Sequence, residues 1–197
     1  MRFWVSISLG FLLSLAAFAQ VPAPSKAPAA KPRKANELTL AGLRPGRDKS
    51  GRAIQLFGKP DSLSEDKESL SWNFEGMEEA LSLNVDVDKA NVVQSIRVTR
   101  VEPPSGVMWP KHAPFPMRWD SGRGLAIGAT QSRVVQIYGE PDSRSPSTKA
   151  GRKLELLYYA FDWAGADVPQ VMEVLCTVGD DGKPGRVVEI TLAAPSL

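Results

Sequence analysis

The sequence predicts an α+β protein built from two homologous modules, each a short helical segment packed on a three-stranded antiparallel sheet. The main observation is an internal repeat: residues 58–62 read GKPDS and residues 139–143 read GEPDS. An amphipathic helical pattern precedes each copy, and three strand-like runs follow each copy in the same order. We therefore expect modules over residues 37–102 and 119–197, joined by a connector rich in proline and aromatic residues at 103–118.

The chain begins with the pattern of a secretory signal peptide. Arg2 supplies a positive charge, residues 5–15 are apolar, and small residues end the pattern at Ala19, so residues 1–19 are predicted to be cleaved off. The apolar run is shorter than the ~20 residues that cross a bilayer, and no cysteine follows the cleavage point. We expect an exported protein, periplasmic or secreted, that is soluble, has no transmembrane segment after cleavage and is not a lipoprotein.

Residues 20–36 are rich in Pro, Ala and basic residues and are predicted to be a disordered linker. The whole chain has 24 basic and 22 acidic residues, and removing the five bases of residues 1–36 leaves 19 basic against 22 acidic. The folded part is thus mildly acidic. Its charge gives no reason to expect nucleic-acid binding. The linker is basic, so it could make weak contact with anionic surfaces.

Capping residues predict where the two helices begin and end. Thr130 is expected to cap the second helix, because its hydroxyl can accept a hydrogen bond from the first turn, and Gly139 is expected to end it. Asp48 and Gly58 take these roles in the first copy. The apolar residues of each helix fall on one face: Ala53, Ile54, Leu56 and Phe57 in the first, and Val134, Val135, Ile137 and Tyr138 in the second.

Alternating apolar residues predict three strands in each module, because a period of two describes a strand with one face on a core and one in solvent. The first module has Leu70, Trp72 and Phe74, then Leu81, Leu83, Val85 and Val87, then Val93, Ile96 and Val98. The second has Leu157, Tyr159 and Phe161, then Met172, Val174, Cys176 and Val178, then Val187, Ile190 and Leu192. Helix, strand, strand, strand is the expected order in both.

The second copy resembles the SmpA/OmlA (BamE-like) family through GATQ at 128–131, an amphipathic turn, GEP at 139–141, an aromatic strand, alternating apolar residues and DGK. In tandem, this unit is similar to the fold of the beta-lactamase inhibitor proteins. The resemblance covers most of residues 38–101 and 125–192, and it implies envelope assembly or enzyme inhibition, both carried out by binding. The chain departs from these families because it lacks the lipidation cysteine, and because Cys176 alone cannot form the disulfides of the inhibitors.

The connector holds candidate recognition residues. They are two tryptophans, a histidine, a phenylalanine and an arginine: Trp109, His112, Phe115, Arg118 and Trp119. Aromatic and arginine side chains dominate binding hot spots. The alternative, which we favour, is that the aromatic side chains pack the two sheets together.

Few residues indicate catalysis. His112 is the single histidine, which leaves little material for a Ser-His-Asp triad or a multi-histidine metal site. Cys176 takes the place of Val85 in the register and is predicted to be a small buried side chain, while Asp86 and Asp88 are explained by turn chemistry. We predict no catalytic activity, no cofactor and no metal.

The sequence therefore predicts a protein-binding scaffold of the bacterial cell envelope, whose partner is another protein. The expected binding surface is the solvent-facing side of the strands: Ser71, Asn73, Ser82, Asn84 and Asp86, followed by Glu155, Tyr158, Glu173, Leu175 and Thr177. Among them, Asn73, Asn84, Tyr158 and Glu173 join the five connector residues as candidate binding residues. Two sheets side by side would offer a gently concave surface broad enough for an interface of about 800 Å² on each side.

Two alternatives stay open at this point. One is a secreted inhibitor of an enzyme, binding through the sheet face or through a loop, either the connector or the hairpin at 145–151. The other is an enzyme of unrecognised kind, which would need a pocket with clustered titratable groups.

Overall fold

A computed structural model describes residues 36–75, 80–101, 119–161, 170–179 and 185–194 of the 197-residue chain. All of them belong to one compact unit, Arg33–Leu197. The predicted signal peptide, the predicted linker apart from its last residue, and the predicted connector lie outside the described residues.

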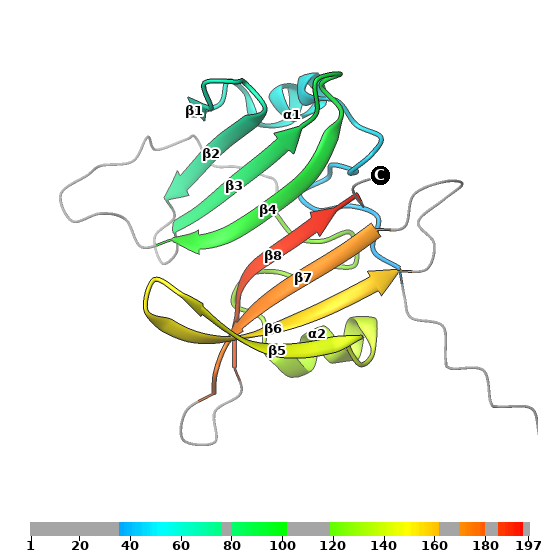
Figure 1. The fold of residues 1–197 in the computed structure, drawn as a ribbon, viewed down its shortest axis with the longest axis vertical. Coiled ribbons are helices and arrows are strands. Elements are labelled where there is room, and N and C mark those ends of the chain that lie inside the picture. The colour runs from blue at the N-terminus through cyan, green and yellow to red at the C-terminus, as the bar shows by residue number, and fades with distance from the viewer. Residues whose placement is uncertain (1–35, 76–79, 102–118, 162–169, 180–184, 195–197) are drawn as a thin grey trace, which may run out of the picture. The chain divides into compact units, whose positions relative to one another are not determined.

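The strands form one eight-stranded antiparallel sheet in the order β1-β2-β3-β4-β8-β7-β6-β5 (Figure 1). The first four strands are β1 Ser62–Leu63, β2 Ser69–Glu75, β3 Ala80–Val87 and β4 Val93–Val101. The last four are β5 Ser143–Lys149, β6 Arg152–Phe161, β7 Gln170–Thr177 and β8 Val187–Ala193. The two helices of the described residues are short, α1 Ser50–Phe57 and α2 Gln131–Tyr138.

The predicted fold class of two modules, each a helical segment on its own three-stranded sheet, is wrong. β4 and β8 pair antiparallel over Ser95–Thr99 and Glu189–Ala193, so that all eight strands belong to a single sheet. Separate modules would have left both strands as edges with unpaired backbone N–H and C=O groups, and their mutual pairing satisfies these groups. The sheet also contains β1 and β5, which the alternation did not predict.

The two helices begin differently although both end at a glycine. Thr130 caps α2 as predicted, its side chain accepting a hydrogen bond from the Arg133 N–H at 3.3 Å. The prediction of Asp48 as the cap of α1 is wrong: Lys49 holds that position, and the Asp48 carboxylate instead accepts from the backbone and the guanidinium of Arg44. Gly58 ends α1 at a φ of 80°, a conformation that favours glycine.

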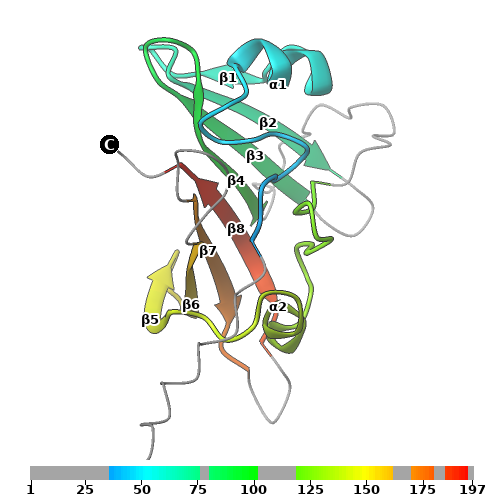
Figure 2. The same ribbon diagram turned by 90° about the vertical axis from the view of Figure 1, so that its right-hand side faces the viewer.

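Both helices pack on the same face of the sheet. Phe57 of α1 lies edge-on to Trp72 of β2, with ring centroids 5.5 Å apart. Tyr138 of α2 lies 5.7 Å from Tyr159 and 6.1 Å from Phe161, both on β6. The core therefore lies between the helices and one side of the sheet, and Figure 2 shows α1 and α2 together on that side.

Candidate binding surface

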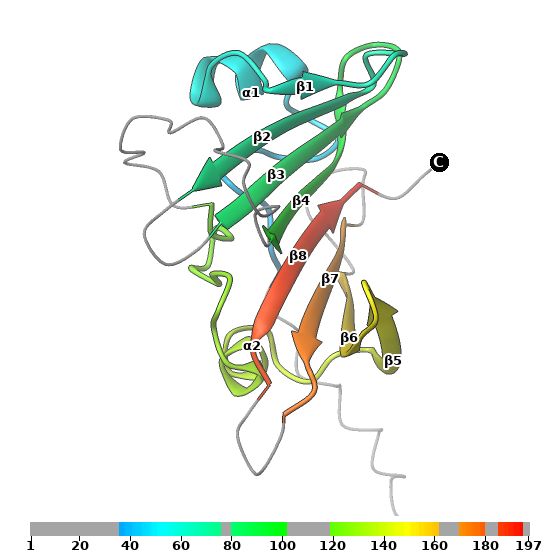
Figure 3. The ribbon, with the colours of Figure 1, turned by 90° about the vertical axis from the view of Figure 1, so that its left-hand side faces the viewer.

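The sheet face turned away from α1 and α2, here called the open face, carries the side chains that alternate with the core residues. Figure 3 shows the strands from the side, with both helices beside one face of the sheet. In the first half the open face consists of Ser69, Ser71, Asn73, Ser82, Asn84, Asp86, Ser95, Arg97 and Thr99, as the strand register places them. In the second half it includes Leu154, Leu156, Tyr158, Ala160, Val171, Glu173, Leu175, Thr177, Glu189, Thr191 and Ala193.

Cross-strand hydrogen bonds order the polar half of the open face. Asp86 accepts from Ser69 Oγ at 2.8 Å and from Ser95 Oγ at 2.5 Å, so one carboxylate joins β2, β3 and β4. Asn84 accepts from Ser71 Oγ at 2.5 Å and donates to Ser82 Oγ at 3.3 Å. Side chains held in this way lose little further freedom when a partner binds, which lowers the entropy cost of association.

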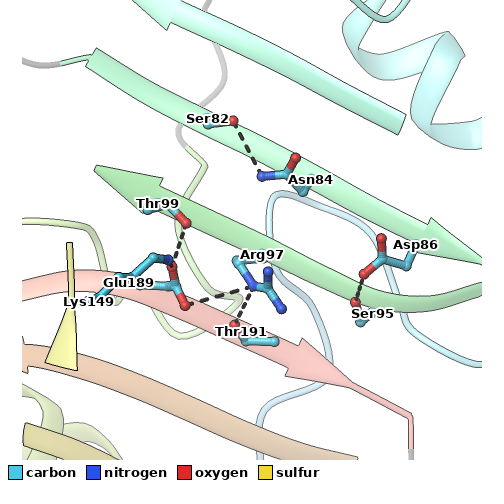
Figure 4. A network of polar contacts seen from close by, with 9 residues as sticks. All are labelled: Ser82, Asn84, Asp86, Ser95, Arg97, Thr99, Lys149, Glu189 and Thr191. Carbon is cyan, nitrogen blue, oxygen red and sulfur yellow. Dashed lines mark hydrogen bonds and ion pairs between the residues drawn. The ribbon is translucent and has the colours of Figure 1, made fainter. Parts of the chain in front are cut away.

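A second group of contacts crosses the junction of the two halves (Figure 4). Glu189 of β8 accepts from Thr99 Oγ1 of β4 at 2.8 Å and from the Lys149 ammonium of β5. Arg97 of β4 places Nε 3.8 Å from the Glu189 carboxylate and donates to Thr191 Oγ1 at 3.4 Å. The side chain of Glu189 is only 10% exposed, and the cost of burying its charge is offset by these two cations.

The other half of the open face is largely apolar. Leu156 of β6 lies opposite Leu175 of β7, and Tyr158 lies opposite Glu173 in the same pair of strands. Leu156, Tyr158 and Leu175 are half-buried although they face away from both helices. Apolar and tyrosine side chains beside a polar region are typical of the centre and rim of protein interfaces.

A cavity of about 400 Å³ opens on this face where β4 and β8 separate. The β4–β8 ladder ends at Thr99 and Glu189, and the strands diverge beyond it (Figure 1). The tip of the β5–β6 hairpin closes the other side, because Lys149 contacts Glu189. We call this space the junction cavity; its lining is Thr99, Arg100, Val101, Lys149, Ala150, Arg152, Leu154, Thr177, Val188 and Glu189.

Four of the predicted binding residues lie on the open face. Asn73 and Asn84 lie in the polar half of the open face, and Tyr158 and Glu173 lie in the apolar half. Trp109, His112, Phe115 and Arg118 lie outside the described residues.

Trp119 is buried, in line with the favoured interpretation that the connector aromatics pack in the interior, whereas Glu155 lies on the opposite face from the one predicted. Trp119 is 6% exposed and packs edge-on against Phe57 and Phe74 in the core, so it does not belong to a binding surface. Glu155 faces the helices, where it accepts a hydrogen bond from Gln131 of α2. Its position on β6 has the parity of Leu157, not that of Tyr158, and this places it on the core side.

The described residues show little of the chemistry of a reactive site. Cys176 is fully buried, as predicted, and burial raises the pKa of its thiol to about 12. Within the described ranges no group of three or more His, Cys, Asp or Glu residues is arranged to hold a metal ion. Asp88 accepts hydrogen bonds from the Ala90 and Val92 N–H groups of its own turn, as turn chemistry predicts. In the same part of the chain, no helix is long and apolar enough to cross a membrane.

Comparisons with known proteins find likenesses among solved structures. No protein-family description matches the chain, and no curated protein matches it. A DUF4309 family protein (YjgB) from Bacillus subtilis is 14% identical, with a TM-score of 0.46 over 81% of this chain and 88% of that one. A cysteine-rich secretory protein from Staphylococcus aureus is 11% identical, with a TM-score of 0.40 over 82% of this chain and 48% of that one.

Proposed function

We propose that this chain is an exported protein-binding scaffold of the bacterial cell envelope, and that the open face of its sheet is the binding surface. The observation that carries the proposal is the apolar patch of Leu156, Tyr158 and Leu175 on a face that α1 and α2 leave uncovered. The export component rests on the signal-peptide pattern of residues 1–19.

The side chains of the open face define the chemistry of the partner. An apolar segment would cover Leu156 and Leu175, while polar groups would meet Arg97 and Glu173 at the margin. Arg97 is 45% exposed even though it lies near Glu189. Arginine and tyrosine are enriched among the residues that dominate interface energetics. We therefore expect a protein surface with an apolar centre and a charged rim.

The proposal is tested by site-specific photo-crosslinking in cells. A photoreactive residue replaces Asn84, Tyr158 or Glu173 on the open face, and the matched controls replace Gln55 of α1 or Gln136 of α2. We expect capture of one saturable protein partner from the open-face positions only. Equal or stronger capture from the helix positions would show that the open face is not the binding surface.

Substitutions then separate binding from folding. Tyr158→Ala and Glu173→Lys should abolish capture from Asn84 while leaving the circular dichroism spectrum and the melting temperature nearly unchanged. The identity of the captured protein distinguishes an assembly scaffold from an inhibitor, since a secreted enzyme that loses activity on binding would assign the inhibitory role.

A further inference from the structure

We propose that the junction cavity binds a small organic anion with a short apolar body. This site is distinct from the protein-binding patch, because its lining comes from the β4–β8 junction and the β5–β6 hairpin and includes neither Leu156 nor Leu175. Its volume of about 400 Å³ falls within the usual range of small-molecule sites.

The position of the cavity follows from the strand pairing. Arg100 and Val101 continue to pair with β3 after the β4–β8 ladder has ended. Val188 lies on the β8 side of this wedge, next to a register shift between Leu175 and Cys176 of β7. Such bulges redirect side chains and are frequent beside functional sites.

The charge of the lining favours an anion. Arg100, Lys149 and Arg152 all line the cavity, and among the described lining residues the acidic side chain is Glu189. The Glu189 carboxylate already accepts from Thr99 and contacts Lys149. The described lining residues therefore carry a net positive charge, which attracts a carboxylate or phosphate to the cavity.

The remaining lining residues favour a ligand with a short apolar chain. Val101, Ala150, Leu154 and Val188 contribute the apolar part of the wall. Leu154 is only 4% exposed although it lies on the open face, so this part of the wall is enclosed. An apolar wall beneath cationic side chains matches a medium-chain carboxylate better than a bare inorganic anion.

Calorimetric titration of the mature protein tests the proposal with four probes: octanoate, octyl phosphate, octylamine and inorganic phosphate. We expect octanoate and octyl phosphate to bind, octylamine not to bind and inorganic phosphate to bind at least tenfold more weakly than either. If octylamine binds as tightly as octanoate, the proposed preference for anions is wrong. If inorganic phosphate binds as tightly as octyl phosphate, the proposed contribution of the apolar chain is wrong.

Variants locate the site. The double variant Lys149→Gln, Arg152→Gln should weaken octanoate binding by about tenfold or more, as loss of hydrogen bonds to charged groups does. The matched control, Arg52→Gln with Arg133→Gln, removes two arginines from α1 and α2, each bonded to a glutamine three residues on, and should not change affinity. An unchanged affinity in the first variant would overturn the proposal.

Val188→Phe provides a test that does not depend on charge, because the larger side chain occupies the cavity. It should abolish octanoate binding, and amide chemical shifts in the parent protein should change around Thr177 and Val188 when octanoate is added. Retained binding, or shift changes confined to the helices, would exclude the junction cavity as the site.

Discussion

Tyr138 donates its hydroxyl hydrogen to Glu37 at 2.6 Å and thereby joins residues 101 positions apart in the chain. The Glu37 carboxylate is almost fully buried and also accepts from the backbone N–H groups of Gly122 and Arg123, both at 3.0 Å. The N–H groups of residues 38–39 complete this set. These hydrogen bonds to the Glu37 carboxylate connect the beginning of the described chain to α2 and to the segment before it.

Glu37→Gln should lower the free energy of unfolding by about 1–3 kcal/mol, because the amide NH₂ would face backbone N–H groups that need an acceptor. Urea unfolding measures the change. The control is Glu65→Gln on the exposed turn after β1, for which we expect less than about 0.5 kcal/mol. Equal effects of both substitutions would contradict a specific role for the buried carboxylate.

Gly122→Ala should also destabilise the protein. A Cβ atom at this position would lie 2.3 Å from Thr39 Oγ1 and 2.7 Å from Glu37 Oε1, so the Glu37 contacts would have to move. Gly51→Ala in α1 is the matched control, since a Cβ there meets nothing within 4 Å. Alanine should stabilise that helix by up to about 1 kcal/mol. Melting temperatures that shift in the same direction for both variants would refute this account.

The β5–β6 hairpin should become more stable on Ala150→Asn. Ala150 and Gly151 form its two-residue turn, with φ values of 49° and 74°, and an Asn-Gly pair is favoured where both central residues have positive φ. We expect the free energy of unfolding to rise by up to about 1 kcal/mol, because alanine is strained at positive φ. Ala150→Val should instead lower it. Chemical denaturation of both variants measures whether the two changes in free energy have opposite signs.

Stability should fall at high pH because three buried groups resist ionisation. Burial raises the pKa of the Cys176 thiol to about 12. It also raises the pKa of Tyr159, and together with the Glu37 hydrogen bond it raises the pKa of Tyr138. An unfolded thiol ionises near pH ~8.5 and an unfolded tyrosine near ~10. Above these values the folded state binds more protons than the unfolded state, so the stabilising contribution is present below pH ~8.5 and is lost as pH rises.

Urea unfolding from pH 7 to pH 11 checks this dependence. The free energy of unfolding should decline by about 1.4 kcal/mol per pH unit for each group concerned. Cys176→Val should remove the decline between about pH 8.5 and 10 and leave the part that the tyrosines contribute. A flat profile in the parent protein, or an unchanged profile in the variant, would contradict the assignment.

The alternation of apolar residues predicted the faces of the strands, but not which strands are neighbours. Leu83 and Val85 lie on the core side, while Asn84 and Asp86 lie on the open face, as expected from a period of two. Lateral pairing leaves no such pattern in the sequence, which is why the β4–β8 junction was missed. β5 was missed because its side chains are almost all exposed and show no alternation.

The junction cavity could not be predicted from the sequence either. Arg100, Lys149 and Glu189 come from three strands that are far apart in the chain, so no local motif marks their proximity. Residue type alone suggests turn chemistry for Asp61 and Asp142, which follow the repeated prolines. Asp61 accepts from the Asn73 N–H and Asp142 from the Ala160 N–H, both at 2.7 Å. These contacts join positions 12 and 18 apart in the chain, so each carboxylate bonds to a neighbouring strand and not to its own turn.

The pairing of β4 with β8 has a consequence for the order of folding. Every other pair of neighbouring strands in the described sheet is consecutive in the chain, whereas Thr99 and Glu189 are 90 positions apart. Closing so long a loop costs more chain entropy than closing a hairpin, and non-local contacts slow folding. We expect the four strands of each half to assemble first, and the sheet to be completed last at its middle.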